Sequence, residues 1–280
     1  MTGDAIMRRF LLYLWNDWFR QVGEALLAAF VVTTFAFTTV GVFGQSMHPT
    51  LANQERVIVP KYVMWAERFG LSSYQRGDIA ILKPPAGAPN EKTRFPVLGF
   101  EFRPYFIKRI IGIPGDRVSV KEGKVYLNGT ALEENYITDY ITPYPDSFPE
   151  LWIENGRPVS LAISSNWLAV ESLPPYLTRV MEYLAPIPAD ILEQSFSTPV
   201  RYTGEIAIPA DHYFVMGDNR RLGGSEDSRI FGPVAADQIA GTANFVWWPP
   251  VASGPEGRRL NWRVLEPPEA FQKLDQSTNQ

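Results

Sequence analysis

The sequence has no cysteine among its 280 residues, which excludes thiolate nucleophiles, disulfide bridges and cysteine-ligated zinc or iron. Histidine is also scarce, with His48 and His212 as the two in the chain. They stand far apart in the sequence, so a histidine-rich metal site is not expected. The formal net charge is −4 and the isoelectric point is about 5.4. Proteins that hold nucleic acid through bulk charge need a basic stripe, so this class is excluded.

One long hydrophobic run is present, and no second run of its length occurs in the sequence. Residues 25–43 carry no charge. At about 1.5 Å rise per residue, a helix of this length reaches across a hydrocarbon core. We expect residues 25–43 to form a single transmembrane anchor that runs into the first strand. A buried core helix is the alternative interpretation.

Residues 1–24 are predicted to be a cytoplasmic or interfacial amphipathic segment, with an amphipathic helix at 5–22. Apolar residues recur there at helical spacing, and the aromatic residues and arginines suit a membrane interface. Three arginines precede the hydrophobic run, and the next basic residue after it is Arg56. By the positive-inside rule, the amino end is cytoplasmic and residues 44–280 lie outside. The run is too long for the apolar core of a cleavable signal peptide and no Ala-x-Ala follows it, so we interpret it as uncleaved.

After residue 44 the pattern becomes alternating, and we expect a mainly β fold with a coiled antiparallel sheet. The clearest signal is residues 117–132, where apolar and polar residues alternate around two pairs typical of tight turns, Glu122-Gly123 and Asn128-Gly129. Further short β-type runs are 56–59, 78–82, 106–111, 205–208, 213–216 and 243–248.

Residues 135–200 have a different character. They hold many prolines and their aromatic residues follow no period. Short helices are expected at 175–184 and 190–196. We interpret residues 135–200 as a second lobe inserted between the two halves, 44–134 and 201–265, of one β-rich domain.

Two other segments are predicted to lie on the surface. Residues 84–104 are punctuated by proline and glycine, which indicates a long loop. Residues 266–280 are polar and are expected to form a frayed tail.

The turn at 44–51 carries a serine and a histidine that suit catalysis. A Ser–His nucleophile pair formed by Ser46 and His48 is one option. The two residues are only two positions apart, which gives no clear hydrogen-bond geometry between their side chains in an extended segment. An ordinary turn serine is the default interpretation.

Lys108 lies in the apolar run 106–111. Alternation places it on one face of a strand together with Phe106 and Ile110. A lysine among apolar neighbours either reaches water at a sheet edge or stays desolvated. In the second case the pKa of the amine falls until the neutral form acts as a base.

Four segments together resemble the sequence boxes of bacterial type I signal peptidases. Each is moderately specific alone, and together they are very specific because they occur in the family's order behind an amino-terminal anchor. The segments are Gly44–Leu51, Arg76–Ile81, Lys108–Asp116 and Gly217–Val234. The resemblance covers roughly residues 22–134 and 201–250. Residues 135–200 are similar only in position to the family's variable second domain.

The resemblance implies a membrane-anchored serine endopeptidase that cleaves signal peptides from exported preproteins after an Ala-x-Ala site. By resemblance, Ser46 is the nucleophile and a neutral Lys108 is the general base, so both histidines are bystanders. A lysine with an ordinary pKa near 10.4 is protonated at neutral pH, so burial must lower its pKa to about 7–8. The resemblance implies no metal and no organic cofactor.

Supporting roles follow from the same resemblance. The backbone N–H of Ser46 is an oxyanion donor, and Gly44 stands where some relatives carry a second donor, a hydroxyl. Ser225 corresponds to a serine that orients the lysine amine. Ser228 is the alternative, because residues 221–224 lengthen the preceding loop beyond the family's usual spacing.

Asp227 and Arg229 resemble a buried ion pair that supports the site, whereas a surface pair is the alternative. Asp218 and Asn219 are expected to form a turn that positions this loop. Two shallow apolar pockets must accept the small residues of the cleavage site. By position, the residues expected to line these pockets are Val42, Leu51, Ile81, Phe106 and Ile107.

The implied partners are exported preproteins, membrane lipid and, functionally, the secretion translocon, with no nucleic acid. The implied location is the bacterial inner membrane, crossed once, with the β-rich catalytic domain outside. Two alternatives remain. One is a Ser–Lys protease dedicated to one substrate, such as a pilus or conjugation protein. The other is a non-catalytic anchored β module of the cell envelope.

Overall fold

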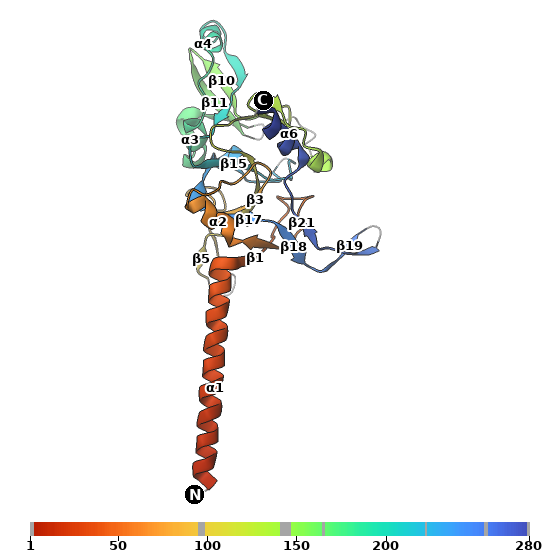
Figure 1. Cartoon of the computed structure of the whole chain (residues 1–280). Helices are drawn as coiled ribbons and strands as arrows, with labels where there is room; N and C mark the ends of the chain where they lie inside the picture. The colour runs from red at the N-terminus through yellow and green to blue at the C-terminus, as the bar shows by residue number, and fades with distance from the viewer. Residues whose placement is uncertain are drawn as a thin grey trace.

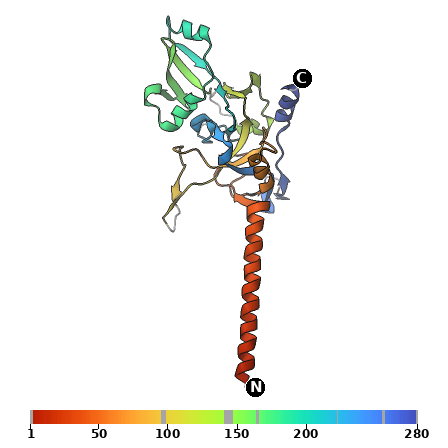
Figure 2. The same cartoon turned by 60° about the vertical axis from the view of Figure 1, so that its left-hand side comes forward.

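The structure is a computed structural model that describes residues 3–94, 99–140, 147–163, 166–221, 223–254 and 257–278. A single long helix, α1 (Gly3–Val31), leads away from a body built mainly from β-strands (Figures 1 and 2). The mainly β fold class predicted from the sequence is confirmed.

The amino-terminal helix differs in its bounds from the prediction. Residues 1–24 and 25–43 were predicted as separate units, but α1 is continuous and passes through a π-turn, η1 (Val32–Ala36), into strand β1 (Phe37–Gly41). The Thr33 hydroxyl donates to the Ala29 carbonyl at 2.8 Å, a bond that loosens helices. Aromatic and β-branched residues then favour the strand. The stretch long and apolar enough to cross a membrane is Trp15–Ala36.

Two antiparallel sheets near the end of α1 combine residues from both halves of the chain. The first has the order β1-β2-β18-β21, with β2 at Arg56–Pro60, β18 at Phe245–Trp248 and β21 at Arg263–Val264. The second has the order β16-β15-β6-β3-β17. Its strands are β16 (Val234–Ala235), β15 (His212–Met216), β6 (Phe106–Gly112), β3 (Ile79–Leu82) and β17 (Ile239–Ala243). These strands confirm most of the predicted β runs.

A third sheet follows β6 and contains the predicted tight turns. Its order is β14-β7-β8-β9, with β14 at Ile206–Ala207, β7 at Arg117–Lys121, β8 at Lys124–Leu127 and β9 at Thr130–Ala131. Glu122 and Gly123 have φ of 50° and 77°, and Asn128 and Gly129 have φ of 50° and 81°. Such positive values are what tight hairpin turns of this kind require, so both predicted turns are confirmed.

A fourth sheet lies far from α1 in Figure 1. Its order is β12-β11-β10-β13, with β10 at Glu150–Glu154, β11 at Arg157–Ile163, β12 at Asn166–Ala169 and β13 at Val200–Thr203. It packs on its own buried cluster of Leu151, Ile153 and Leu161. The predicted short helices are present as α3 (Pro175–Glu182) and α4 (Ala189–Gln194). The strands here were not predicted, because prolines and irregular aromatics mask their alternation.

The remaining elements are short and connect or flank these sheets. They are α2 (Lys61–Arg68), β4 (Thr93–Arg94), β5 (Glu101–Phe102), η2 (Asn135–Tyr140), η3 (Val170–Ser172), α5 (Ser228–Phe231), η4 (Ala236–Gln238), β19 (Val251–Gly254) and β20 (Gly257–Leu260). The predicted loop at 84–104 therefore contains the small β4–β5 pair, and residues 95–98 lie outside the described part.

The frayed tail predicted at 266–280 is wrong for residues 269–278, and residues 279–280 lie outside the described part. Residues Glu269–Thr278 form helix α6, and Phe271 is only 1% exposed. Ala270 and Leu274 pack beside Phe271 against the core. Gly77 permits this docking, because a Cβ there would lie 2.8 Å from the Pro267 Cβ and 3.0 Å from a Phe271 ring carbon. One aromatic residue thus anchors a mostly polar segment.

Candidate active site

Strand β6 carries two adjacent cations into the interior. It lies between β3 and β15, so both of its edges are hydrogen-bonded. Lys108 pairs in register with Ala80, and Arg109 pairs with Met216. Lys108 is 4% exposed and Arg109 2%. Because the strand is central and not at an edge, Lys108 has no short path to water along the sheet.

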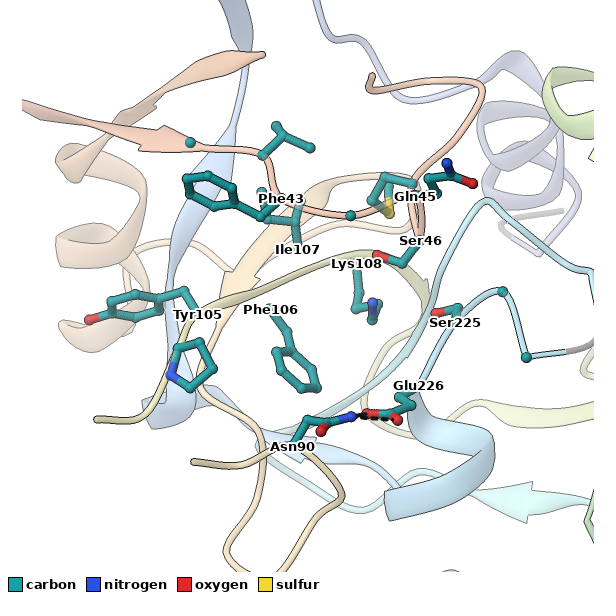
Figure 3. A pocket seen from close by; sticks show the side chains of 17 residues that line it. Phe43, Gln45, Ser46, Asn90, Tyr105, Phe106, Ile107, Lys108, Ser225 and Glu226 are labelled. Carbon is teal, nitrogen blue, oxygen red and sulfur yellow. Dashed lines mark hydrogen bonds between the residues drawn. The ribbon is translucent and has the colours of Figure 1, made fainter. Parts of the chain in front are cut away.

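A cavity of about 370 Å³ brings Lys108 together with two serines. Ser46 comes from the turn that follows β1, and Ser225 comes from the loop before α5. In Figure 3 the side chains of Ser46, Lys108 and Ser225 converge on one point. The predicted site residues that line this cavity are Val42, Gly44, Ser46, Phe106, Ile107, Lys108 and Ser225. Neither histidine is among its lining residues.

The loop after β15 fixes the backbone of the Ser46 turn. The Asn219 backbone N–H donates to the Ser46 carbonyl at 3.0 Å, and the Asn219 side-chain amide donates to the Gln45 carbonyl at 3.1 Å. Gly44 has a φ of 89°, and its N–H donates to the Asn53 side chain at 3.0 Å. No acceptor within the described residues engages the Ser46 backbone N–H. This donor is therefore available to a ligand in the cavity.

Gly217 allows the two serines to approach each other. A Cβ at this position would lie 2.4 Å from the Ser46 carbonyl oxygen and 2.3 Å from the Ser225 Oγ. Any side chain at 217 would therefore push the two segments apart. The Ser225 Oγ is buried, and it has no hydrogen-bond partner among the described residues. A buried hydroxyl left in this state is suited to bind a group that enters the cavity.

The Lys108 amine has the electrostatic environment of a base. Burial lowers the pKa of Lys108 to about 8, although the negative charges of Asp227 and Glu226 act to raise it. Its Nζ lies 5.4 Å from the centre of the Phe106 ring. The Lys108 amine forms no hydrogen bond with any of the described residues. A substantial fraction of the amine is thus neutral slightly above neutral pH.

Asp227 and Arg229 form an ion pair behind the cavity. Arg229 Nε and Nη2 donate to the two Asp227 carboxylate oxygens at 2.9 and 3.0 Å, and the Gly217 N–H adds a bond at 3.0 Å. Burial alone raises the pKa of Asp227, but the charge and hydrogen bonds of Arg229 outweigh it and hold this pKa below its usual value. Asp227 also caps α5 by accepting from the Arg229 N–H. The pair is buried rather than a surface pair.

Ser225, and not the alternative Ser228, lines the cavity. The Gly224 N–H donates to the Arg221 carbonyl at 2.7 Å, which closes a tight turn before Ser225. The Ser228 hydroxyl instead accepts from the Val215 N–H at 2.9 Å and is fully buried.

A second buried ion pair, between Arg109 and Asp218, was missed by sequence reasoning. Arg109 Nε and Nη2 donate to the two Asp218 oxygens at 2.8 and 2.7 Å. Arg109 Nη1 donates to the Gly77 carbonyl at 2.7 Å, and the guanidinium lies 4.6 Å from the centre of the Tyr136 ring. Asp218 is thus more than a turn residue. An arginine in a central apolar strand needs a buried acceptor, which is most often a carboxylate. The position of Arg109 in such a strand was therefore the sequence signal that could have indicated this ion pair.

Two predicted pocket residues lie elsewhere. Ile81 lines a neighbouring apolar cavity of about 610 Å³. The two cavities share the lining residues Gly41, Phe43, Pro104 and Tyr105. Leu51 is fully buried in the core and lines neither cavity. The lining residues that sequence reasoning did not identify include Phe43, Tyr105, Asn90 and Glu226.

No cluster of three or more metal-ligating side chains occurs among the residues that the structure describes. The groups that the cavity offers are a serine hydroxyl, a desolvated amine and a backbone donor. Such a set is suited to nucleophilic attack on a carbonyl.

Comparison with known proteins gives consistent matches. The family model described as signal peptidase, peptidase S26, matches residues 15–248. Signal peptidase I P of Bacillus subtilis subsp. natto is 29% identical over 250 residues, which are 89% of this chain and 96% of that protein. Signal peptidase I S of Bacillus subtilis strain 168 is 29% identical and covers 83% of this chain and 89% of its own. Signal peptidase IB of Staphylococcus aureus strain Mu50 is 27% identical with the same coverage, 83% and 89%.

Proposed function

This chain belongs to the signal peptidase family, peptidase S26, and acts as a hydrolase on preproteins that carry signal peptides. On that premise we propose that Ser46 is its nucleophile and Lys108 its general base. The observation that carries the proposal is the cavity in which the Ser46 hydroxyl and the buried Lys108 amine lie together (Figure 3). A lowered pKa of about 8 for Lys108 supports the role of base.

The proposed reaction has two stages. The neutral Lys108 amine removes the Ser46 hydroxyl proton while Oγ bonds to the scissile carbonyl carbon. The oxyanion accepts a hydrogen bond from the Ser46 backbone N–H. The C–N bond then breaks, and the Lys108 ammonium donates its proton to the leaving amine. The same amine then deprotonates a water molecule, whose oxygen bonds to the acyl carbon. The bond from this carbon to Ser46 Oγ breaks, and the Lys108 ammonium returns its proton to Oγ, which restores the enzyme.

Other residues support this dyad in the proposal. Ser225, whose buried hydroxyl lacks a partner, accepts from or donates to the Lys108 amine and orients it. Asp227 and Arg229 hold the Ser225 loop through Gly217. Gly44 supplies no hydroxyl, so the oxyanion depends on backbone donors. In this arrangement the histidines take no part.

The substrate is proposed to bind as an extended strand and to be cut after Ala-x-Ala. Strand β1 has one edge with no partner strand among the described residues, and it leads directly to Ser46. An added strand forms main-chain hydrogen bonds along such an edge. Val42, Phe106 and Ile107 line the cavity beside the dyad and restrict it to small side chains. Ile81 contributes to the adjoining cavity, and Leu51 supports Val42 from the core.

The helix α1 is proposed to anchor the enzyme in the bacterial inner membrane. The stretch Trp15–Ala36 is exposed along its length and apolar enough to span a bilayer. The amino terminus is cytoplasmic, and the catalytic domain (44–134 and 201–265) and inserted lobe (135–200) are outside. The anchor holds the site where signal peptides leave the secretion translocon, which raises the local substrate concentration.

Cleavage of a preprotein with an Ala-x-Ala site, in detergent, tests this function. Wild type is compared with Ser46→Ala and Lys108→Ala, and with the matched exposed controls Ser172→Ala and Lys121→Ala. Wild type and controls should cut after the second alanine, while both site variants lose activity by at least about 10³-fold. Full activity of Lys108→Ala would remove it as the base. No cleavage by wild type would favour a dedicated-substrate protease or a non-catalytic module.

A further inference from the structure

Asn90 and Glu226 form a contact at the edge of the catalytic cavity. The Asn90 side-chain amide donates to both Glu226 carboxylate oxygens, at 2.7 and 2.8 Å (Figure 3). The two residues are 136 positions apart in the sequence, and both line the cavity. Asn90 is held at a φ of 54°, which asparagine tolerates. The carboxylate therefore has a fixed orientation at the mouth of the cavity.

The charge of Glu226 is oriented by this contact but not neutralised. Asn90 is a neutral donor, and within the described residues Glu226 forms no salt bridge. Its side chain is half-buried, so its field is only partly screened. The negative charge of Glu226 acts to raise the pKa of the Lys108 amine, which lines the same cavity. Glu226 thus places a negative charge beside the dyad.

Two sides of the cavity differ in chemistry. Phe43 and Tyr105 mark the side that adjoins the larger apolar cavity beside β1. Glu226 and Asn90 lie on another side of the cavity, with Phe106 between Tyr105 and Asn90, and Glu226 lies close to Ser225 (Figure 3). If the apolar signal peptide occupies the apolar side next to the anchor, the chain beyond the scissile bond leaves on the side of Glu226. This assignment of direction rests on the proposed function.

We propose that Glu226, oriented by Asn90, binds the first residues of the mature protein and selects for positive charge there. A lysine or arginine side chain near the scissile bond gains a favourable interaction with the carboxylate, and an acidic side chain is repelled. The released α-amino group becomes an ammonium at neutral pH and is stabilised in the same way. Glu226 is thus a specificity-determining residue and not a reacting group.

Three preproteins that differ only at the second residue after the cleavage site, as Lys, Ala or Asp, test the proposal. The kcat/KM ratio of the Lys to the Asp substrate is measured for wild type, Glu226→Gln and Glu226→Lys. The matched control is Glu171→Gln, an exposed glutamate of the inserted lobe. Wild type and control should favour Lys over Asp by about threefold to tenfold. The ratio should approach one in Glu226→Gln and invert in Glu226→Lys.

A second measurement does not depend on any variant. Raising the ionic strength should reduce the wild-type ratio, because salt screens a half-buried charge. The proposal is overturned if the Lys-to-Asp ratio of kcat/KM is the same in Glu226→Gln as in wild type, or if the wild-type ratio is one. Cleavage of the three substrates would still support the protease function in either case. Failure of wild type to cut any of the three substrates overturns the proposed function and this inference with it.

Discussion

Lys108 and Arg109 are neighbours on β6 and both are buried, but only the Arg109 side chain has a carboxylate partner. The Arg109 side chain is bound by both carboxylate oxygens of Asp218, whereas the Lys108 amine forms no hydrogen bond with a described residue. Burial alone lowers the pKa of each cation. The Asp218 charge reverses this for Arg109, and the pKa of Lys108 stays lowered at about 8. One strand thus holds a permanent structural charge and an amine that can lose its proton.

The first prediction concerns the pH dependence of cleavage. If the neutral Lys108 amine is the base, kcat/KM should rise with pH around an apparent pKa of about 8. Initial rates at subsaturating substrate between pH 6 and 10 measure this, with enzyme stability checked at each pH. A midpoint near the ordinary lysine value of about 10.4 would contradict a desolvated base, and one near about 6.5 would indicate a histidine.

The second prediction is that removing the base stabilises the fold. The pKa of Lys108 is about 8 in the folded chain and 10.5 without burial. Between these values the unfolded chain binds more protons, so wild-type stability rises with pH across this window. At neutral pH the buried ammonium costs about 3 kcal/mol, at 1.36 kcal/mol per pKa unit.

Lys108→Met should therefore be inactive but have a higher Tm than wild type at pH 7, with the gain shrinking toward pH 10.5. Thermal unfolding in detergent at several pH values measures both. Lys121→Met, at an exposed position of β7, is the control and should show no such trend. A Tm that falls at every pH would mean that the Lys108 amine stabilises the fold.

Local signals in the sequence were enough to predict much of the fold. The turn at Asn128-Gly129 and the central strand around Lys108 depend on short patterns of backbone preference and alternation, and both are present. The apolar neighbours of Lys108 left open whether its amine reaches water or is desolvated, and the resemblance to signal peptidases selected the second. Alternation assigns a face to each side chain even when the partner strands are unknown.

Features that depend on distant contacts were not predictable in this way. Phe271 is the one large aromatic residue of a polar tail, and it is buried because Gly77 leaves space for it. Asp218 meets Arg109 across 109 positions, and Asn90 meets Glu226 across 136. No local periodicity encodes such pairings, since they follow from strand order and register. The polar partner of a buried cation therefore had to come from the structure.

The third prediction concerns the Arg109–Asp218 pair. Arg109→Met should destabilise the protein by about 3–5 kcal/mol, because it leaves the Asp218 carboxylate buried without its partner. Asp218→Asn should lower the free energy of unfolding by a similar amount. The double variant should lower it by less than the sum of the two single losses. Urea unfolding of all four proteins measures the coupling, and strictly additive losses would mean that the pair is not a unit.

The fourth prediction separates electrostatic from structural action at Asp227 and Arg229. In the folded protein the Asp227 charge raises the pKa of Lys108, and the Arg229 charge lowers it. Asp227→Asn should therefore move the pH midpoint of kcat/KM below that of wild type, and Arg229→Met should move it above. Both variants break the same buried ion pair and lose stability, so a purely structural role would lower kcat in both without opposite shifts. The pH profiles of the two variants, each measured well below its own Tm, decide between these roles. Shifts in the same direction, or none, would show that the pair positions the Ser225 loop without tuning the Lys108 amine.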